Sequence, residues 1–548
     1  MPVKAFRLTN FMAFGEWENE NDGWIELRPI TLLFGRNSSG KSTILRALRF
    51  LRQSLDGGPD GAPFVYSSPD GVDVGGFLAL AHRAPGKRPR YNPFTYREKY
   101  PNWDSGRKVS FDFRVVLSAT DTAKLGDVLG DSARQSSSLE FKLSLSYGYL
   151  ADQKRVGLMA FAMALIQPLD SEDSRVVILT AVRVPHQRFD ESSPKGWKFD
   201  SDFLFPPEDT PLIVEPVDEK FGVYKDDKTF FLETDLTKTT GFLPSLAGEP
   251  EHRRLRTENS DFADNLLQAL SKEIRGFLEK IEHVRPIRPE PLRIFMLDDA
   301  EQELWQNQGR AAYLRLLRKD LSGSETEALD TWLSALELGQ RVRVHDLLKR
   351  VDGRPEAHLA AIASTVTIVE PSGNEIDLRD VGYGAAQVIP VIVQSLLAQE
   401  GTLTLIEQPE LHLHPQAQAA LGDLFIDRVH GSSDARFLIE SHSEHLLLRL
   451  RRRIAETSAE ALLGEDGVPP RNKGYGLYWD EFNLLFIERD PESGSSTIET
   501  VTVDHLGQLV GPSEAFREFF DDDFDEAVEL AKAKSLIIAA ESEYGSKG

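Results

Sequence analysis

The feature that most constrains this chain is the segment GRNSSGKS, from Gly35 to Ser42, which follows the pattern G-x-x-x-x-G-K-[ST]. The residues before it, 31–34, form a short apolar run typical of a buried strand. From Ser42 to Leu51 the apolar residues recur at helical spacing. The sequence therefore predicts a strand, a glycine-containing loop and a helix in succession, which is the arrangement that binds the phosphates of a nucleotide.

The residue types in this loop each fit phosphate chemistry. Gly35 and Gly40 let the backbone curl so that successive N–H groups face a phosphate, and the following helix adds its positive N-terminal end. Lys41 can reach the β- and γ-phosphates, and the Ser42 hydroxyl can ligate Mg²⁺. The predicted nucleotide-binding residues are Asn37, Ser38, Ser39, Gly40, Lys41, Ser42 and Thr43.

A second apolar segment, 403–406, ends in Glu407. In phosphate-loop enzymes a carboxylate at the end of such a strand holds the Mg²⁺ shell, so we predict Ser42 and Glu407 as the metal residues. Gln408 follows, and a glutamine cannot take a proton from an attacking water, although it can orient that water. Glu410 could supply the base instead. These two alternatives stay open, and both are compatible with slow hydrolysis.

A third apolar segment, 437–440, is followed two residues later by His442. A histidine after such a strand can hydrogen-bond a γ-phosphate, whereas a histidine considered alone is more often structural. His412 and His414 resemble a metal pair only superficially, because a proline follows them and no third ligand is near. We therefore expect no zinc site there.

Composition narrows the class of protein. The chain has 548 residues, of which 41% are hydrophobic and 27% charged, as in globular proteins. Its length suffices for about three to four domains. The formal net charge of −24 argues against a general nucleic-acid coat, although a local basic patch could still bind DNA. The absence of cysteine excludes disulfides, Cys-based zinc sites, iron–sulfur clusters and thiol chemistry.

Nothing in the sequence indicates secretion or a membrane span. The first residues, 1–4, lack the apolar core of a signal peptide. The uncharged stretch from Val381 to Gln399 contains glycines, glutamines and Pro390, so we predict a buried loop and helix there. We expect a cytoplasmic protein with no membrane partner.

Hydrophobic periodicity predicts the remaining elements. Strands are expected within 3–34, 111–115, 139–147 and 175–184, the last three as an antiparallel sheet. Residues 52–108 are expected to form mostly loop, with a helical turn near 77–81. Helices are expected over 258–281 and 311–348, a hairpin over 366–378, and alternating strands and helices over 403–453.

Several motifs in a fixed order carry a family resemblance. They are Asn10-Phe11, the loop from Gly35 to Ser42, Asp380 to Gln387, Glu407 to Pro415, and Ser441 to His445. This series resembles the RecF/SMC-like branch of the ABC ATPases. More narrowly, it resembles the bacterial AAA-type ATPases related to the OLD family and to the ATPase subunits of the Septu, PARIS and Gabija anti-phage systems. The resemblance covers both ends of the catalytic module and is weak between residues 52 and 255.

The resemblance implies an α/β fold, namely an ABC/SMC-like P-loop ATPase head in two lobes with an inserted region of antiparallel strands and helices. It implies ATP and Mg²⁺ as cofactors, Glu407 as the Walker B acid, residues 411–415 as the D-loop and His442 as the switch histidine. The implied domains are an N-terminal ATPase lobe over 1–240, a helical insertion over 241–360, a C-terminal ATPase lobe over 361–500, and an acidic tail over 501–548.

The resemblance also implies a signature loop that caps the γ-phosphate of another subunit's nucleotide. Gly384, Ala386 and Gln387 would belong to this loop, so a homodimer or a larger even assembly is expected. The chain departs from the pattern, because alanines replace the usual small hydroxyl residue and no Q-loop glutamine is found near 75–82. Both departures favour slow turnover.

The resemblance assigns the chain to anti-phage defence. The OLD and Gabija ATPases continue into a Toprim nuclease, whereas here only about a hundred residues follow Arg453. The acidic cluster 521–526 reads as a solvated helix start rather than a metal site. We therefore expect a separate effector protein, a nuclease or a toxin. Two alternatives remain: a RecF-type DNA-repair ATPase, and a scaffold or sensor that binds ATP without hydrolysing it.

Two basic segments leave DNA as a candidate partner. The arginines within 449–453 either neutralise acidic neighbours or contact a DNA backbone. The segment 83–108 interleaves basic and aromatic residues, as in single-strand nucleic-acid binding, and a partner-binding loop explains it equally well.

Overall fold

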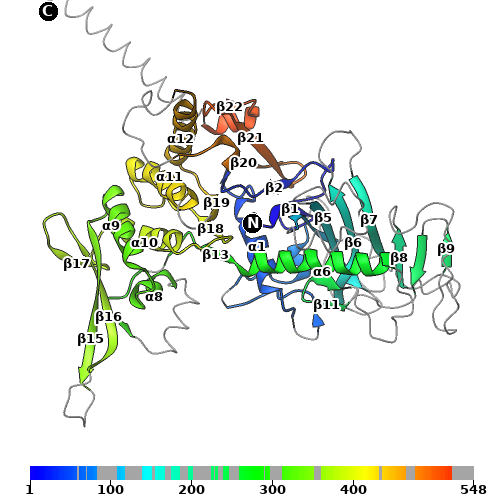
Figure 1. Ribbon diagram of the computed structural model, residues 1–548, viewed down its shortest axis with the longest axis horizontal. Coiled ribbons are helices and arrows are strands. Elements are labelled where there is room, and N and C mark those ends of the chain that lie inside the picture. Colours follow the sequence, from blue (N-terminus) through cyan, green and yellow to red (C-terminus); the bar gives the residue numbers. More distant parts are fainter. Residues whose placement is uncertain are drawn as a thin grey trace, which may run out of the picture.

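The computed structural model of the protein contains two large sheets, with helices packed between and around them (Figure 1). It describes residues 1–58, 61–69, 71–82, 108–117, 139–150, 155–166, 175–184, 196–200, 224–226, 229–232, 238–245, 258–288, 290–296, 311–350, 359–430, 435–463 and 476–520. The basic and aromatic segment 83–107 and the acidic cluster from residue 521 lie outside these ranges, so the interpretations made for them stay predictions.

The sheet that carries the phosphate loop is mostly parallel and has the strand order β13-β18-β19-β3-β20-β21-β22. Its strands are β13 (Ile281–Val284), β18 (Leu403–Glu407), β19 (Arg436–Glu440), β3 (Ile30–Phe34), β20 (Phe482–Arg489), β21 (Ser496–Val503) and β22 (Leu509–Val510). The first five strands are parallel to one another. At one edge of the sheet, β21 pairs antiparallel with β20 and β22 pairs antiparallel with β21. Segments from both ends of the chain thus pair in one sheet, which confirms the α/β class.

The second sheet is antiparallel and has nine strands among the described residues. In sheet order they are β2 (Trp24–Glu26), β1 (Val3–Thr9), β4 (Val109–Val116), β5 (Glu140–Leu150), β6 (Arg155–Ile166), β7 (Arg175–Val184), β8 (Gly196–Asp200), β10 (Thr229–Leu232) and β9 (Tyr224–Asp226). The predicted antiparallel arrangement is confirmed. The sequence did not reveal β6, because its run GLMAFAMALI is apolar throughout and lacks the alternation that marks a half-buried strand.

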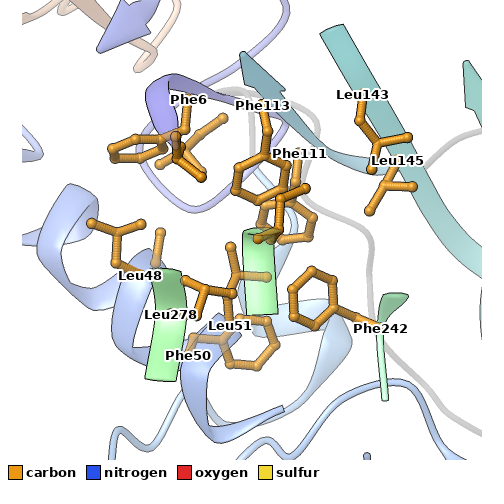
Figure 2. Close-up of a cluster of buried hydrophobic side chains, with 14 of the residues drawn as sticks. Phe6, Leu48, Phe50, Leu51, Phe111, Phe113, Leu143, Leu145, Phe242 and Leu278 are labelled. Carbon is orange, nitrogen blue, oxygen red and sulfur yellow. The ribbon is translucent and has the colours of Figure 1, made fainter. Parts of the chain in front are cut away.

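Two hydrophobic cores cover the two faces of the parallel sheet. Alternate residues of β3 divide between them, with Leu33 in one core and Leu32 and Phe34 in the other. The first core lies between the sheets and includes α1 (Lys41–Gln53) and α6 (Glu258–Glu279). Figure 2 shows part of it, where Leu48, Phe50 and Leu51 of α1 meet side chains of β4, β5 and α6. Burial on both faces explains why β3 has no exposed residue.

The second core contains the helices of the C-terminal half. These are α8 (Ala311–Leu317), α9 (Gly323–Ala335), α10 (Tyr383–Leu396), α11 (Pro415–His430) and α12 (Glu444–Leu463). Every residue of α10 from Ala385 to Leu396 is buried, so the uncharged stretch is a buried helix as predicted. In the described part of the chain, no helix combines the length and apolarity that a membrane crossing requires.

The predicted helix over 311–348 is wrong in its last part, from residue 341 onward. After α8 and α9 the chain forms β15 (Arg341–Arg350), which pairs antiparallel with β16 (Leu359–Val369). The run RVRVH alternates charged or polar and apolar residues, a strand period that the longer helical pattern obscured. The expected hairpin over 366–378 is confirmed, because β17 (Glu375–Asp377) pairs antiparallel with the end of β16. The short strand β14 (Phe295–Met296) pairs with β16 at Ala363 and Ser364.

The segment 241–360 is therefore not a purely helical insertion. It also contains β12 (Leu243–Ser245), which pairs with β11 (Lys238–Thr240) just before the segment, and its strand β13 belongs to the parallel sheet. The hairpin of β15 and β16 extends away from both sheets (Figure 1). The four-domain division itself stays a prediction.

Candidate functional site

The phosphate loop connects β3 to α1, as predicted. Gly35 has a φ of 143° and Gly40 a φ of 111°, a region that favours glycine. A Cβ atom on Gly35 would lie 2.1 Å from the carbonyl oxygen of Ile487, and one on Gly40 would lie 2.9 Å from Cβ of Ala13. Both glycines of the motif are thus required by backbone conformation and by close packing.

A pocket opens over this loop. Its walls include every predicted residue from Asn37 to Thr43, together with Gln408 and His442. The parallel sheet explains the meeting, because the carboxyl ends of β3, β18 and β19 lie at one edge. The structure therefore brings together three segments that the sequence analysis had placed at the ends of separate strands.

Lys41 is buried at the base of the pocket, where its Nζ donates to the carbonyl oxygens of Gly35 and Arg36 over 2.7 and 3.0 Å. Burial lowers the pKa of Lys41, and the carboxylates of Glu440 and Glu410 partly offset this effect. A buried ammonium is stabilised by an opposite charge. A phosphate group in the pocket would supply that charge.

The carboxylate of the predicted metal residue Glu407 forms a hydrogen bond with a histidine rather than with Ser42. Its Oε1 lies 2.6 Å from Nε2 of His283 on β13, and Glu407 is not among the residues that line the pocket. Burial lowers the pKa of His283, which favours the neutral ring, while its hydrogen bond with Glu407 opposes this shift. The two predicted metal residues, Ser42 and Glu407, therefore hydrogen-bond to different partners, Glu440 and His283.

Glu440 is the carboxylate that contacts Ser42, and the sequence analysis did not single it out. The Ser42 hydroxyl donates to Oε1 of Glu440 over 2.9 Å, and Glu440 lines the pocket. Burial is the main cause that raises the pKa of Glu440, and the nearby charge of Glu407 raises it further. The hydrogen bond from Ser42 and the positive charge of Lys41 act in the opposite direction. The signal was available, because Glu440 ends an apolar strand in the same way as Glu407.

Of the two candidates for serving the attacking water, only Gln408 lines the pocket. Glu410 is buried, and its Oε1 accepts a hydrogen bond of 2.7 Å from the backbone N–H of His442. Burial raises the pKa of Glu410, and the hydrogen bond from His442 acts in the opposite direction. Glu410 therefore holds the backbone at His442 in place through this hydrogen bond.

His442 faces the pocket from the end of β19 and is half-buried. Burial, and then the charge of Lys41, lower the pKa of its imidazole. The ring is consequently neutral at neutral pH, so that one nitrogen can donate a hydrogen bond to a phosphate oxygen and the other can accept one.

The predicted signature loop lies at the start of α10, and none of its residues line the pocket. Gln387 is 2% exposed; its Oε1 accepts from the N–H of Arg288 and its Nε2 donates to the carbonyl oxygen of Arg288. Ala386 is also buried, whereas Gly384 is partly exposed. In this structure, therefore, the side chains of Ala386 and Gln387 are not presented to another molecule.

Several pocket residues escaped the sequence analysis because they come from distant segments. They are Met12, Ala13, Ala79, Ala81, His82, Glu440, Arg489 and Gly494. Hydrogen bonds to backbone carbonyl groups hold these segments to one another and to the phosphate loop. The N–H of His82 donates to the carbonyl oxygen of Asn10, and the Ser496 hydroxyl donates to that of Ser39. His82 follows α2 (Phe77–Leu80), at the place where no Q-loop glutamine was found.

The basic cluster on α12 is engaged within the chain. Arg449 and Arg453 both pair with Asp423 of α11, Arg452 pairs with Glu456, and Arg451 donates to the carbonyl oxygen of Gly507. These pairs favour the interpretation that the cluster neutralises acidic neighbours over the interpretation that it contacts DNA.

A phosphate loop after the central strand of a parallel sheet, with polar residues at the ends of the neighbouring strands, defines the class of P-loop nucleotide-binding domains. The family model of the AAA ATPase domain matches residues 1–447, so the chain belongs to that family. No match to the chain was found among curated proteins.

Similar solved structures include heads of SMC proteins. The SmcHead bound to the C-winged helix domain of ScpA is 9% identical, with 92% of this chain and 99% of that chain covered and a TM-score of 0.37. The Smc head domain bound to the C-terminal domain of ScpA from Pyrococcus furiosus is 10% identical, with coverages of 92% and 97% and a TM-score of 0.34. The SMC head domain from Thermotoga maritima is 9% identical, with coverages of 91% and 99% and a TM-score of 0.33. At such identities and TM-scores the likeness adds no argument about function.

Proposed function

We propose that this protein is an ATP-binding and slowly ATP-hydrolysing subunit of an anti-phage defence complex, in which nucleotide-dependent pairing of the ATPase domains controls a separate effector protein. The observation that carries the enzymatic part is the pocket that gathers Lys41, Gln408 and His442 over the phosphate loop. Membership in the AAA ATPase domain family supports the same activity.

The residues of the pocket divide the work of hydrolysis. The loop N–H groups and Lys41 would bind the phosphates, and the neutral His442 would hydrogen-bond the terminal one. Gln408 would orient the attacking water without removing its proton, which explains why we expect slow turnover. The Ser42 hydroxyl and the partly unpaired carboxylate of Glu440 fit Mg²⁺, which supplies charge neutralisation on the phosphates when bound.

The position of α10 supports the pairing of two ATPase domains. Its N-cap residue Gly382 and its first residue Tyr383 are exposed, and neither lines the chain's own pocket. A helix N-terminus attracts phosphate, so this one would complete a nucleotide site on a second copy. The backbone N–H groups, rather than the buried side chains of Ala386 and Gln387, would make that contact.

The enzymatic proposal is tested by ATP binding and steady-state turnover of the full chain beside Lys41→Ala. Loss of a charge-assisted bond should weaken ATP binding by about 10- to 100-fold and abolish turnover. Lys319→Ala is the matched control, because Lys319 is exposed and does not line the pocket. Wild-type binding and turnover in Lys41→Ala would refute the proposed site.

The defence role needs a test of its own. In cells that carry the gene with its genomic neighbours, phage should plate poorly, and Lys41→Ala should restore plating to the level of cells without the gene. Equal protection by Lys41→Ala would separate defence from nucleotide binding.

The two alternative functions are distinguished by the same turnover assay. Tight ATP binding without turnover would favour the scaffold or sensor, which the glutamine at position 408 makes the stronger alternative. DNA-stimulated turnover would favour the repair ATPase, which the internal pairing of the α12 arginines opposes.

A further inference from the structure

Glu440 carries an oxygen that the described part of the protein leaves without a partner. The residue is 5% exposed and ends β19 at the pocket. Its Oε1 accepts the hydrogen bond from Ser42, whereas its Oε2 is buried and has no hydrogen-bond partner among the described residues. A buried carboxylate oxygen without a donor is costly, so its position at a pocket indicates that it contacts a bound ligand.

The nearby ammonium group of Lys41 does not hydrogen-bond to Oε2 of Glu440. Nζ of Lys41 donates to the carbonyl oxygens of Gly35 and Arg36. A serine hydroxyl beside a carboxylate oxygen offers two hard oxygen donors, which suit a small divalent cation. Since the phosphate loop, which includes Ser42, lines the same pocket, the cation would lie next to the bound phosphates.

Glu407 offers a contrast within the same sheet. β18 and β19 pair Glu407 with Glu440 in register, yet only Glu440 lines the pocket. The Glu407 carboxylate is 2.6 Å from His283 and has a donor there. The two strand-end glutamates are therefore not equivalent, although the sequence presents them alike.

We propose that Glu440, together with Ser42, binds the divalent cation that accompanies the nucleotide, and that Glu407 acts on the site only through its neighbours. This inference rests on the proposed function, because it assigns the cation of the same nucleotide site. It replaces the carboxylate expected from the sequence with the one that contacts Ser42.

The test compares Glu440→Gln with Glu407→Gln, a matched pair that removes one charge from each strand end without changing side-chain size. Mn²⁺ binding to the full-length protein with saturating ATP is measured by electron paramagnetic resonance. Binding of a fluorescent ATP analogue in EDTA is measured separately. We expect Glu440→Gln to weaken Mn²⁺ binding by about 10- to 100-fold and Glu407→Gln by less than about threefold.

The EDTA arm separates this inference from the proposed function. Metal-free nucleotide binding by Glu440→Gln should stay within about twofold of wild type, because the phosphate loop is intact. If the wild-type protein binds no nucleotide, the proposed function fails. If it binds nucleotide and Glu407→Gln loses Mn²⁺ while Glu440→Gln keeps it, the function stands and the assignment to Glu440 is wrong.

Two further measurements support the comparison. The melting temperature of Glu440→Gln should lie within a few degrees of that of wild type, which shows that the variant is folded. Ser42→Ala should weaken Mn²⁺ binding to an extent similar to Glu440→Gln. If Glu440→Gln is unstable, Glu440→Asp takes its place, and unchanged Mn²⁺ binding in that variant together with Ser42→Ala would overturn the proposal.

Discussion

Gln408 combines a left-handed backbone, with a φ of 46°, and a place in the pocket wall. Its N–H donates to the carbonyl oxygen of Glu440 over 2.7 Å, which fixes the backbone at the end of β18 against β19. A non-glycine residue in this conformation is held by its surroundings. The side chain is therefore positioned, but its amide cannot accept a proton from water.

This residue yields the first prediction. Gln408→Glu should raise steady-state ATP turnover by about tenfold or more, since a positioned base contributes roughly 10²- to 10⁴-fold. Phosphate release at saturating ATP and Mg²⁺ measures the change. Gln408→Ala is the control and should lower turnover below wild type. Equal ATP turnover in wild type, Gln408→Glu and Gln408→Ala would show that the side chain at position 408 neither orients nor deprotonates the attacking water.

At the scale of elements, Arg288 connects the start of α10 with the end of β18. It is 1% exposed, and burial lowers the pKa of its guanidinium to about 10. Its two terminal nitrogens donate to the carbonyl oxygens of Gln387 and Glu407, each over 3.0 Å. The helix that would contact a second nucleotide is thereby joined to the strand that bears Gln408.

The amide of Gln387 should be essential to this joint. Gln387→Leu leaves the buried N–H and C=O of Arg288 without partners, at about 1–3 kcal/mol each, so the free energy of unfolding should fall by roughly 2–5 kcal/mol. Gln394→Leu on the same helix is the matched control, because Nε2 of Gln394 is buried without a partner in the described structure. Urea denaturation should find that variant as stable as wild type or more so.

A pH-dependent contact joins α11 to the turn η6 (Trp479–Glu481). Nε2 of His430 lies 3.1 Å from Oε2 of Glu481, and this hydrogen bond raises the pKa of His430 above its ordinary 6.5. The stabilisation is complete below pH 6.5 and is lost as pH rises through the raised pKa.

His430→Gln should therefore lower the free energy of unfolding by about 0.2–1 kcal/mol at pH 6 and by nothing measurable at pH 9. Urea denaturation at the two pH values measures the difference. His505→Gln, at an exposed histidine, should have no effect at either pH. A cost for His430→Gln that is equal at both values would assign the contact to packing rather than to charge.

At the scale of the whole molecule, the pocket draws on residues from Met12 to Gly494. It lies at the carboxyl edge of the parallel sheet, and β3, the strand before the phosphate loop, contributes residues to the hydrophobic core on each face of that sheet. The exposed start of α10 contributes no residue to this pocket.

An assembly prediction follows from that arrangement. ATP with Mg²⁺ should double the molar mass of the Gln408→Ala protein in light scattering, because slow turnover would preserve the nucleotide-bound pair. Adding Lys41→Ala should abolish the doubling, whereas adding Lys319→Ala should not. A mass that stays constant with saturating ATP would contradict head-to-tail pairing.

The sequence by itself determined the parts whose geometry is local. The loop from Gly35 to Ser42 is contiguous, and its conformation follows from the glycines and the helix start, so its fold and its residues were predictable. The strand ends at Glu407 and Glu440, and His442 after them, were also marked by apolar runs.

Only the tertiary structure decided which of these residues share the pocket. Glu440 rather than Glu407 meets Ser42, and Glu410 holds the backbone of His442, because side-chain direction at a strand end depends on neighbouring strands and their donors. The same holds for β15, whose pairing with β16 overrode a helical pattern, and for Gln387, whose amide bonds Arg288 inside the protein. Local periodicity is encoded in adjacent residues, whereas these choices rest on contacts between residues far apart in the chain.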